Sequence, residues 1–181
     1  MRPLALLIPT RTDAFLVRLI KSAMVLGERL AGDLSIVIAD NGLVNQWMGD
    51  APAIRTVQVT EPFVFARAVN LAAASATPDA DLLVCNDDVE FVSRSPLTTF
   101  RRLLAREREH GAVEKFPHGV GLLSATIIGG CGNPDQHGEG LSPGQVGLTM
   151  FSLAFIAVAI RRECWDIVGG LDESFVESSF D

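Results

Sequence analysis

The sequence has few cysteines and no excess of basic residues, and each shortage excludes a class of protein. Its three cysteines, Cys85, Cys131 and Cys164, are far apart and form no CxxC pair, so neither a zinc ribbon nor a redox motif is expected. We expect reduced thiols in a reducing compartment. The 15 basic and 22 acidic residues give a net charge of -7, which argues against a protein that binds nucleic acid through the phosphate backbone.

Long apolar runs are also missing. The longest, residues 148–160, is interrupted by Thr149 and Ser152 and is shorter than the roughly 18 residues that a membrane span requires. The apolar start at residues 4–8 is closed by Pro9 and is not followed by the cleavage site of a signal peptide. We therefore expect a cytoplasmic protein, and leave peripheral attachment to a membrane open.

Three common catalytic motifs do not occur in the sequence. It contains no GxGxxG, no Walker A motif and no GxSxG, which disfavours nicotinamide dehydrogenases, P-loop NTPases and serine hydrolases. Internal repeats and low-complexity linkers are absent as well. The 181 residues, 48% of them hydrophobic, are enough for one domain with a buried core.

Apolar runs typical of buried strands alternate with segments of helical periodicity. The expected strands are residues 4–8, 34–39, 54–59, 82–85, 120–128 and 150–160, and the expected helices begin near residues 15, 65, 96 and 161. Residues 129–147 are rich in glycine and proline and predict a functional loop. This order predicts an α/β fold: a single domain whose open, mostly parallel sheet has helices on both faces.

Polar clusters follow three of the expected strands, at residues 9–11 (Pro-Thr-Arg), 40–42 (Asp-Asn-Gly) and 86–88 (Asn-Asp-Asp). The carboxyl ends of parallel strands meet at one edge of the sheet, where such sheets bind ligands, so we expect one site. The adjacent carboxylates Asp87 and Asp88 repel one another unless a cation or hydrogen-bond donors compensate. Oxygen ligands beside a diphosphate suit Mg2+ or Mn2+. Residues 86–88 are therefore the predicted metal site, and the alternative is a solvated turn.

Other candidate residues have plainer alternatives. Asp40 could accept a hydrogen bond from a base imide or close an Asx turn. Arg67 and Asn70 are three residues apart on one helical face and could meet phosphate or base oxygens, but a surface salt bridge is the simpler interpretation for Arg67. His137 could reach a ligand from its glycine-flanked loop or could simply be exposed.

Five segments, in this order, resemble family 2 glycosyltransferases of the GT-A fold. They are residues 6–10 (LLIPT), 38–42 (IADNG), 65–70 (FARAVN), 85–91 (CNDDVEF) and 169–175 (GGLDESF). The resemblance covers essentially the whole chain, and Asn-Asp-Asp is similar to the DxD motif of the family. The loop around Gln136 and His137 resembles one in bacterial members that transfer rhamnose and similar sugars.

The resemblance implies an inverting enzyme that moves a sugar from a nucleotide-diphosphate sugar to an acceptor hydroxyl with Mn2+ or Mg2+. It implies that Pro9, Thr10 and Asp40 hold the base, Asp87 contacts the ribose and Asp88 ligates the metal. The remaining donor-binding candidates are Arg11, Asn41, Arg67, Asn70 and Asn86. The implied general base is Asp181, and His137, Asp172 and Glu173 are expected on the acceptor side.

The expected partners are a nucleotide-diphosphate sugar and a saccharide or lipid-linked acceptor, as in polysaccharide biosynthesis, with a homodimer left open. Because the family normally continues beyond Asp181 with an acceptor-binding segment, we expect residues 1–181 to be a GT-A-like nucleotide-sugar-binding domain truncated at its acceptor-binding part. One alternative is a non-catalytic sugar-nucleotide-binding or assembly module. Another is a sugar-nucleotide pyrophosphorylase. That chemistry usually requires a glycine-rich, basic phosphate loop after the first strand, and residues 9–13, which occupy that position, contain no glycine.

Overall fold

The computed structural model describes residues 1–25, 33–41, 53–109, 120–129, 134–138, 146–147 and 152–175. Its elements are β1 (Leu4–Thr10), α1 (Leu16–Val25), β2 (Leu34–Asp40), β3 (Ile54–Gln58), α2 (Phe65–Ser75), β4 (Asp81–Cys85), α3 (Pro96–Glu109), β5 (Leu122–Ser124), the 3-10 helix η2 (Pro134–His137), β6 (Ala157–Ile160) and α4 (Arg162–Val168). No helix in this part of the chain is long and apolar enough to cross a membrane.

The strands that the structure describes form one sheet in the order β3-β2-β1-β4-β6-β5. β1 to β4 run parallel to one another, and β6 is antiparallel to both of its neighbours, β4 and β5. β1 is buried along its whole length, which suits a sequence that is apolar up to Thr10, because a parallel strand covered on both faces is mostly apolar.

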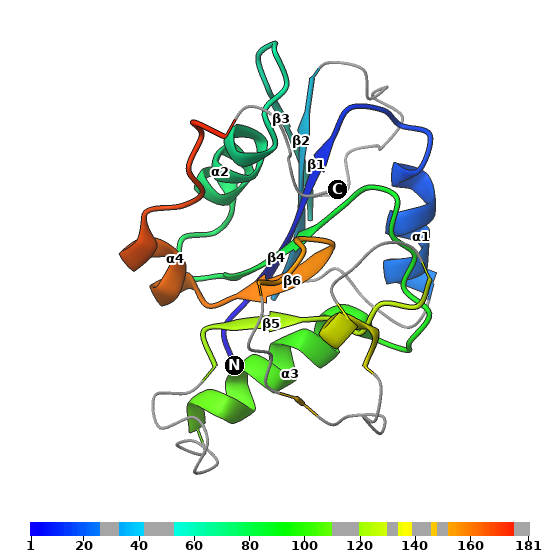
Figure 1. The fold of residues 1–181 in the computed structure, drawn as a ribbon, viewed down its shortest axis with the longest axis vertical. Helices are drawn as coiled ribbons and strands as arrows, with labels where there is room; N and C mark the ends of the chain where they lie inside the picture. The colour runs from blue at the N-terminus through cyan, green and yellow to red at the C-terminus, as the bar shows by residue number, and fades with distance from the viewer. Residues whose placement is uncertain are drawn as a thin grey trace.

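Successive residues of β1 contribute to two separate cores, since side chains of a strand alternate between the faces of a sheet. Leu4, Leu6 and Ile8 belong to one core, and Ala5 and Leu7 belong to the other. Figure 1 shows α1 and α3 over the first face and α2 and α4 over the second. The alanine-rich sequence of α2 allows that helix to pack closely on the sheet, where its alanines are buried.

A buried arginine at the start of α4 fixes that helix beside the end of α2. The Arg162 side chain donates from Nε to the carbonyl of Ala80 at 3.0 Å and from Nη2 to the carbonyls of Thr77 and Ala73 at 3.3 and 3.4 Å. These bonds join the start of α4 to the end of α2 and to the turn that follows it, and they give the buried guanidinium the partners that a buried charge needs. The chain that follows α4 is thereby directed back towards α2.

Two predicted strands were too long. Of residues 120–128 only Leu122–Ser124 are strand, and in the described part of residues 150–160 only Ala157–Ile160 are. In the segment before β6 a side chain distant in sequence takes the place of a strand partner: Gln136 accepts from the amide of Ala154 at 2.9 Å and donates to its carbonyl at 3.0 Å. The backbone of Ala154 therefore pairs with a side chain instead of a strand.

Candidate functional site

The carboxyl ends of β1, β2 and β4 meet at one edge of the sheet. Thr10 ends β1 and pairs in register with Asp40, which ends β2 and is buried. The hydroxyl of Thr10 lies 2.5 Å from a carboxylate oxygen of Asp87, just beyond β4. We call Thr10, Asp40, Asp87 and Asp88 the acidic edge. The structure thus brings the three polar clusters expected from the sequence together.

Burial and mutual repulsion shape the electrostatics of the acidic edge. Asp87 is half-buried, and its pKa is raised chiefly by that burial and further by the charge of Asp88, although the hydrogen bond from Thr10 opposes the shift. Burial also raises the pKa of the Cys85 thiol, with contributions from Asp88 and Asp87. Cys85 therefore stays a neutral thiol, and a cation beside Asp87 and Asp88 would relieve their repulsion.

The acidic edge fits a metal ion that arrives together with a phosphorylated ligand. In the described residues no group of three or more His, Cys, Asp or Glu side chains could hold a metal, so the protein offers no complete cage. Mg2+ is commonly held by one or two carboxylates together with phosphate oxygens and waters. Asp88, whose carboxylate is exposed, and its neighbour Asp87 can supply the one or two carboxylates that such a site needs.

The loop that follows β3 borders the acidic edge. The guanidinium carbon of Arg11 lies 5.6 Å from the centre of the Phe63 ring, within the range of a cation–π contact. Asn41 donates from Nδ2 to Glu61 at 3.0 Å, and its buried Oδ1 has no hydrogen-bond partner among the described residues. Sequence reasoning missed Phe63 and Glu61, although applying the strand-end rule to the third strand would have drawn attention to Glu61.

A cleft of about 360 Å³ opens at the carboxyl end of β3. It is lined by Gln58, Val59, Thr60, Arg67, Leu71 and Glu173, and we call it the β3 cleft. The amide of Val59 donates to the carbonyl of Asp40 at 2.6 Å. The backbone at the β3 cleft is therefore bonded directly to that of Asp40 at the acidic edge.

Residues 170–175, which we call the strap, lie against α2 (Figure 1). The side chain of Asn70 accepts from the amide of Leu171 and donates to its carbonyl, both at 2.9 Å. Asn70 also donates to Glu173 Oε1 at 2.9 Å, and Arg67 Nε lies 3.4 Å from Glu173 Oε2. The helix face predicted to bind the donor thus contacts a segment about 100 residues later in the chain.

Two glycines turn the chain from α4 into the strap. Gly169 and Gly170 have φ values of 86° and 92°, which side chains disfavour. Further along, Asp172 accepts from the amide of Ser174 at 2.9 Å, and this hydrogen bond lowers the pKa of the Asp172 carboxyl. The carboxylates of Asp172 and Glu173 therefore differ in role: the first bonds within the strap and the second bonds to α2.

The loop that carries His137 is fastened by its buried neighbour, Gln136. Besides its two bonds to Ala154, the Gln136 amide donates to the hydroxyl of Ser124 at 2.7 Å. His137 is exposed, and its Nδ1 lies 3.3 Å from the carbonyl of Ile127, so a hydrogen bond there requires the proton on Nδ1. No local pattern in the sequence indicates the role of Gln136.

The remaining predicted site residues are spread along the same edge or lie outside the described residues. Pro9 is buried within β1. The backbone amide of the half-buried Asn86 donates to the carbonyl of Ile156 at 2.9 Å, and this bond ties residues 86–88 to the segment before β6. Asp181, predicted as the general base, lies outside the described residues.

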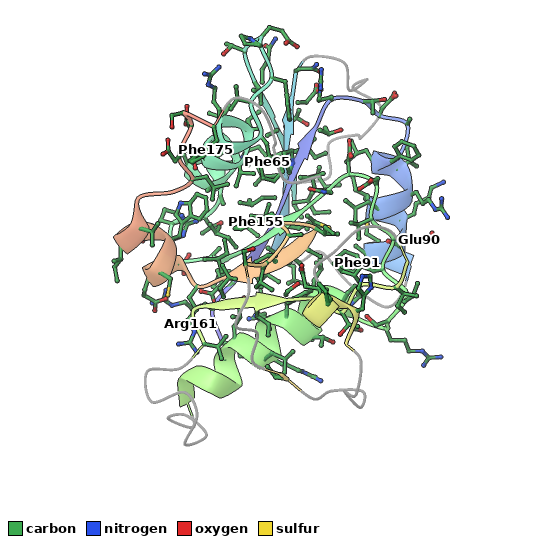
Figure 2. All side chains as sticks on the ribbon, viewed as in Figure 1. Phe65, Glu90, Phe91, Phe155, Arg161 and Phe175 are labelled. Carbon is green, nitrogen blue, oxygen red and sulfur yellow. The ribbon has the colours of Figure 1, made fainter. Side chains whose placement is uncertain are left out.

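A second cleft, of about 500 Å³, lies on the other face of the sheet. It is lined by Ala14, Val17, Arg18, Lys21, Ser22, Glu90 and Phe91, and we call it the α1 cleft. An ion pair of 2.6 Å joins Arg18 of α1 to Glu90. Figure 2 shows Glu90 and Phe175 of the strap on opposite sides of the sheet.

Sequence comparison gives little information on function. No family model matches the chain. An uncharacterized protein of Sinorhizobium fredii is 27% identical, and the match covers 97% of this chain but 21% of that protein.

Structural comparison is more informative. The mannosyltransferase PcManGT from Pyrobaculum calidifontis, solved in complex with GDP-Man and Mn2+, matches with a TM-score of 0.68 at 18% identity, over 96% of this chain and 48% of that one. S. aureus TarS in complex with UDP matches with a TM-score of 0.65 at 11% identity, over 97% and 52%. Glucosyl-3-phosphoglycerate synthase from Mycobacterium tuberculosis, in complex with Mn2+, UDP and phosphoglyceric acid, gives 0.51 at 17% identity, over 90% and 56%.

These matches concern the fold. The chain is a single α/β domain with a mostly parallel sheet and matches the GT-A fold, so the fold predicted from the sequence is confirmed. It spans about half the length of the solved structures that it matches.

Proposed function

We propose that this chain is the donor-binding domain of a glycosyltransferase and binds a nucleotide-diphosphate sugar at the acidic edge. The observation that carries the proposal is the 2.5 Å contact between Thr10 and Asp87, because it joins the ends of β1 and β4 beside buried Asp40. Open α/β sheets bind their ligands at this edge. Solved structures of the same fold include one in complex with GDP-Man and Mn2+ and one in complex with UDP, which supports a nucleotide ligand here.

Each group of the acidic edge has a suitable task in this proposal. Asp40 and the neighbouring Pro9 and Thr10 hold the base, with the Asp40 carboxylate accepting from a base imide. Asp87 accepts from a ribose hydroxyl, and its existing bond to Thr10 keeps the carboxylate in place. Arg11, Asn41 and Asn86 complete the polar wall around the nucleotide, and Arg67 and Asn70 form its far side.

Asp88 is the proposed ligand of Mn2+ or Mg2+, in line with the fit described above. When bound, the ion neutralises negative charge on the diphosphate that departs. Asp181 is the proposed general base that removes the proton from the acceptor hydroxyl, which lets that oxygen attack the anomeric carbon from the side opposite the nucleotide and invert it. His137, Asp172 and Glu173 remain the candidates for the acceptor side.

The finer assignments extend this proposal. We propose transfer of a hexose or deoxyhexose, of the kind that rhamnosyltransferase-like bacterial enzymes use, to a saccharide or lipid-linked acceptor in polysaccharide biosynthesis. The supporting observation is the resemblance of the loop at Gln136 and His137. Cytoplasmic location, peripheral membrane association and a homodimer stay predictions from the sequence.

Calorimetry with UDP, TDP and GDP, each with and without Mn2+, tests donor binding. The proposal expects one nucleotide to bind more tightly when Mn2+ is present and expects Asp88→Asn to abolish that gain. If no nucleotide binds in a metal-dependent way, the proposal is wrong. Donor hydrolysis or transfer that is lost in Asp88→Asn would further exclude a non-catalytic binding module.

A further inference from the structure

We propose that Glu173 is a positioning residue, which orients the guanidinium of Arg67 towards a nucleotide bound beside the β3 cleft. This inference rests on the proposed function and adds a role for the strap. It differs from the acceptor-side role expected for Glu173, because here Glu173 acts through another side chain.

The Glu173 carboxylate bridges two donors on α2. One oxygen accepts from Asn70 Nδ2 at 2.9 Å, and the other lies 3.4 Å from Arg67 Nε. Asn70 is itself fixed, because it also pairs with both the amide and the carbonyl of Leu171. The carboxylate is therefore held at a defined place on the helix before it meets Arg67.

The contact engages only one of the nitrogens of Arg67. Within the described residues Nε contacts Glu173, and the terminal nitrogens Nη1 and Nη2 have no hydrogen-bond partner. A guanidinium is planar and carries its donors in a fixed fork, so fixing Nε also fixes the direction in which the terminal nitrogens point. Those nitrogens remain available to a ligand.

The surroundings of Arg67 connect it to the proposed donor site. Arg67 and Glu173 both line the β3 cleft, together with the polar side chains of Gln58 and Thr60. The same cleft includes Val59, whose amide bonds to the carbonyl of Asp40 at the acidic edge. A nucleotide that binds at the acidic edge and extends across the ends of β2 and β3 would come within reach of the fork of Arg67.

The sign of one mutational effect distinguishes positioning from simple electrostatics. A nucleotide diphosphate is an anion, so removing the negative charge of Glu173 would tighten binding if charge alone mattered. Positioning predicts the opposite, since Glu173→Gln cannot accept from both Asn70 and Arg67 and the guanidinium loses its fixed direction. An exposed ion pair contributes about 0.2–1 kcal/mol, which corresponds to roughly a 1.5- to 5-fold change in affinity.

Calorimetry on four proteins tests the inference: the unaltered chain, Glu173→Gln, Arg67→Ala and the double variant, each titrated with UDP, TDP or GDP in the presence of Mn2+. We expect Glu173→Gln to weaken binding by roughly 1.5- to 5-fold in the unaltered background and to have no further effect when Arg67 is alanine. Asp166→Asn is the matched control, because it removes a carboxylate from nearby α4 whose contact is with Arg162 at 3.9 Å; its affinity should equal that of the unaltered chain.

Two calorimetric outcomes overturn the inference. One is unchanged or tighter binding in Glu173→Gln, and the other is equal weakening with and without Arg67, which would mean that the strap acts by another route. NMR of the Arg67 Nε–H group gives a readout that needs no nucleotide: we expect a resonance that Glu173→Gln shifts and exposes to faster exchange with water. If Glu173→Gln leaves this resonance unchanged, the positioning role is wrong even if nucleotides bind. If the resonance changes as expected but no nucleotide binds, the proposed function is wrong, and the contact between Glu173 and Arg67 still stands.

Discussion

Replacing Gly170 by alanine tests how the strap is held on α2. Gly170 has a φ of 92°, and a Cβ built there would lie 2.7 Å from Oδ1 of Asn70 and 3.3 Å from its Cγ. The Asn70 side chain cannot move away freely, because it bonds to both backbone groups of Leu171 and to Glu173. Alanine at this position therefore displaces Asn70 from the strap.

The expected loss of stability has two parts. A non-glycine residue in this backbone region costs about 1–2 kcal/mol. Displacing Asn70 also breaks its two bonds to Leu171, at about 1 kcal/mol each. We expect Gly170→Ala to lower the free energy of unfolding by about 3–4 kcal/mol, or the melting temperature by roughly 6–16 °C for a chain of this size.

Gly169→Ala is the matched control for this prediction. Gly169 lies in the same turn with a φ of 86°, but a Cβ there meets nothing within 4 Å, so only the backbone part of about 1–2 kcal/mol is lost. Urea unfolding of both variants measures the difference. In an Asn70→Ala background, Gly170→Ala should cost no more than Gly169→Ala. Equal losses for the two glycine variants in the unaltered background would refute the claim that Gly170 is needed for the contact with Asn70.

Three further predictions concern the acidic edge and its surroundings. Asp88→Asn should weaken nucleotide binding in the presence of Mn2+ by more than about tenfold, because it removes the metal ligand. Glu90→Gln, which removes a carboxylate that pairs with Arg18 of α1, should leave that affinity unchanged. Equal losses of affinity by calorimetry would contradict the metal role. Asp87→Asn should raise the melting temperature of the metal-free protein at pH 7. Burial raises the pKa of Asp87 in the folded state, so the cost of its charge is fully present above that pKa and disappears as pH falls towards the unfolded value of 3.8. Thermal unfolding should therefore show that the difference in melting temperature between Asp87→Asn and the unaltered chain shrinks towards pH 4. A lower melting temperature of Asp87→Asn at pH 7 would refute the reasoning. Gln136→Ala removes three hydrogen bonds, two to the backbone of Ala154 and one to the hydroxyl of Ser124, and should cost about 2–4 kcal/mol by urea unfolding. A loss below about 1 kcal/mol would contradict its fastening role.

The centre of the sheet could be predicted from the sequence because its signals are local. The apolar runs at residues 4–8 and 82–85 end in polar clusters, and the parallel order then places Thr10, Asp40 and Asp87 at one edge. The strand-end rule needs only the direction of each strand. It therefore predicted which residues would meet before any long-range contact was known.

The parts that sequence reasoning missed depend on partners far away in the chain. Asn70 was predicted to meet a ligand, and nothing near it indicates that its amide bonds to Leu171, 101 residues later. The segment before β6 reads as strand because it is apolar, and the side chain of Gln136 that interrupts it lies 18 residues earlier. Periodicity within a window cannot report such side-chain contacts, and they hold both the strap and the segment before β6.

A crystal structure of the chain grown with UDP, TDP or GDP and Mn2+ is the most direct test of where the ligand binds. The account predicts an anomalous manganese peak beside the Asp88 carboxylate, with the base next to Asp40 and the ribose next to Asp87. Manganese and nucleotide bound in the α1 cleft, with the acidic edge facing only solvent, would contradict it.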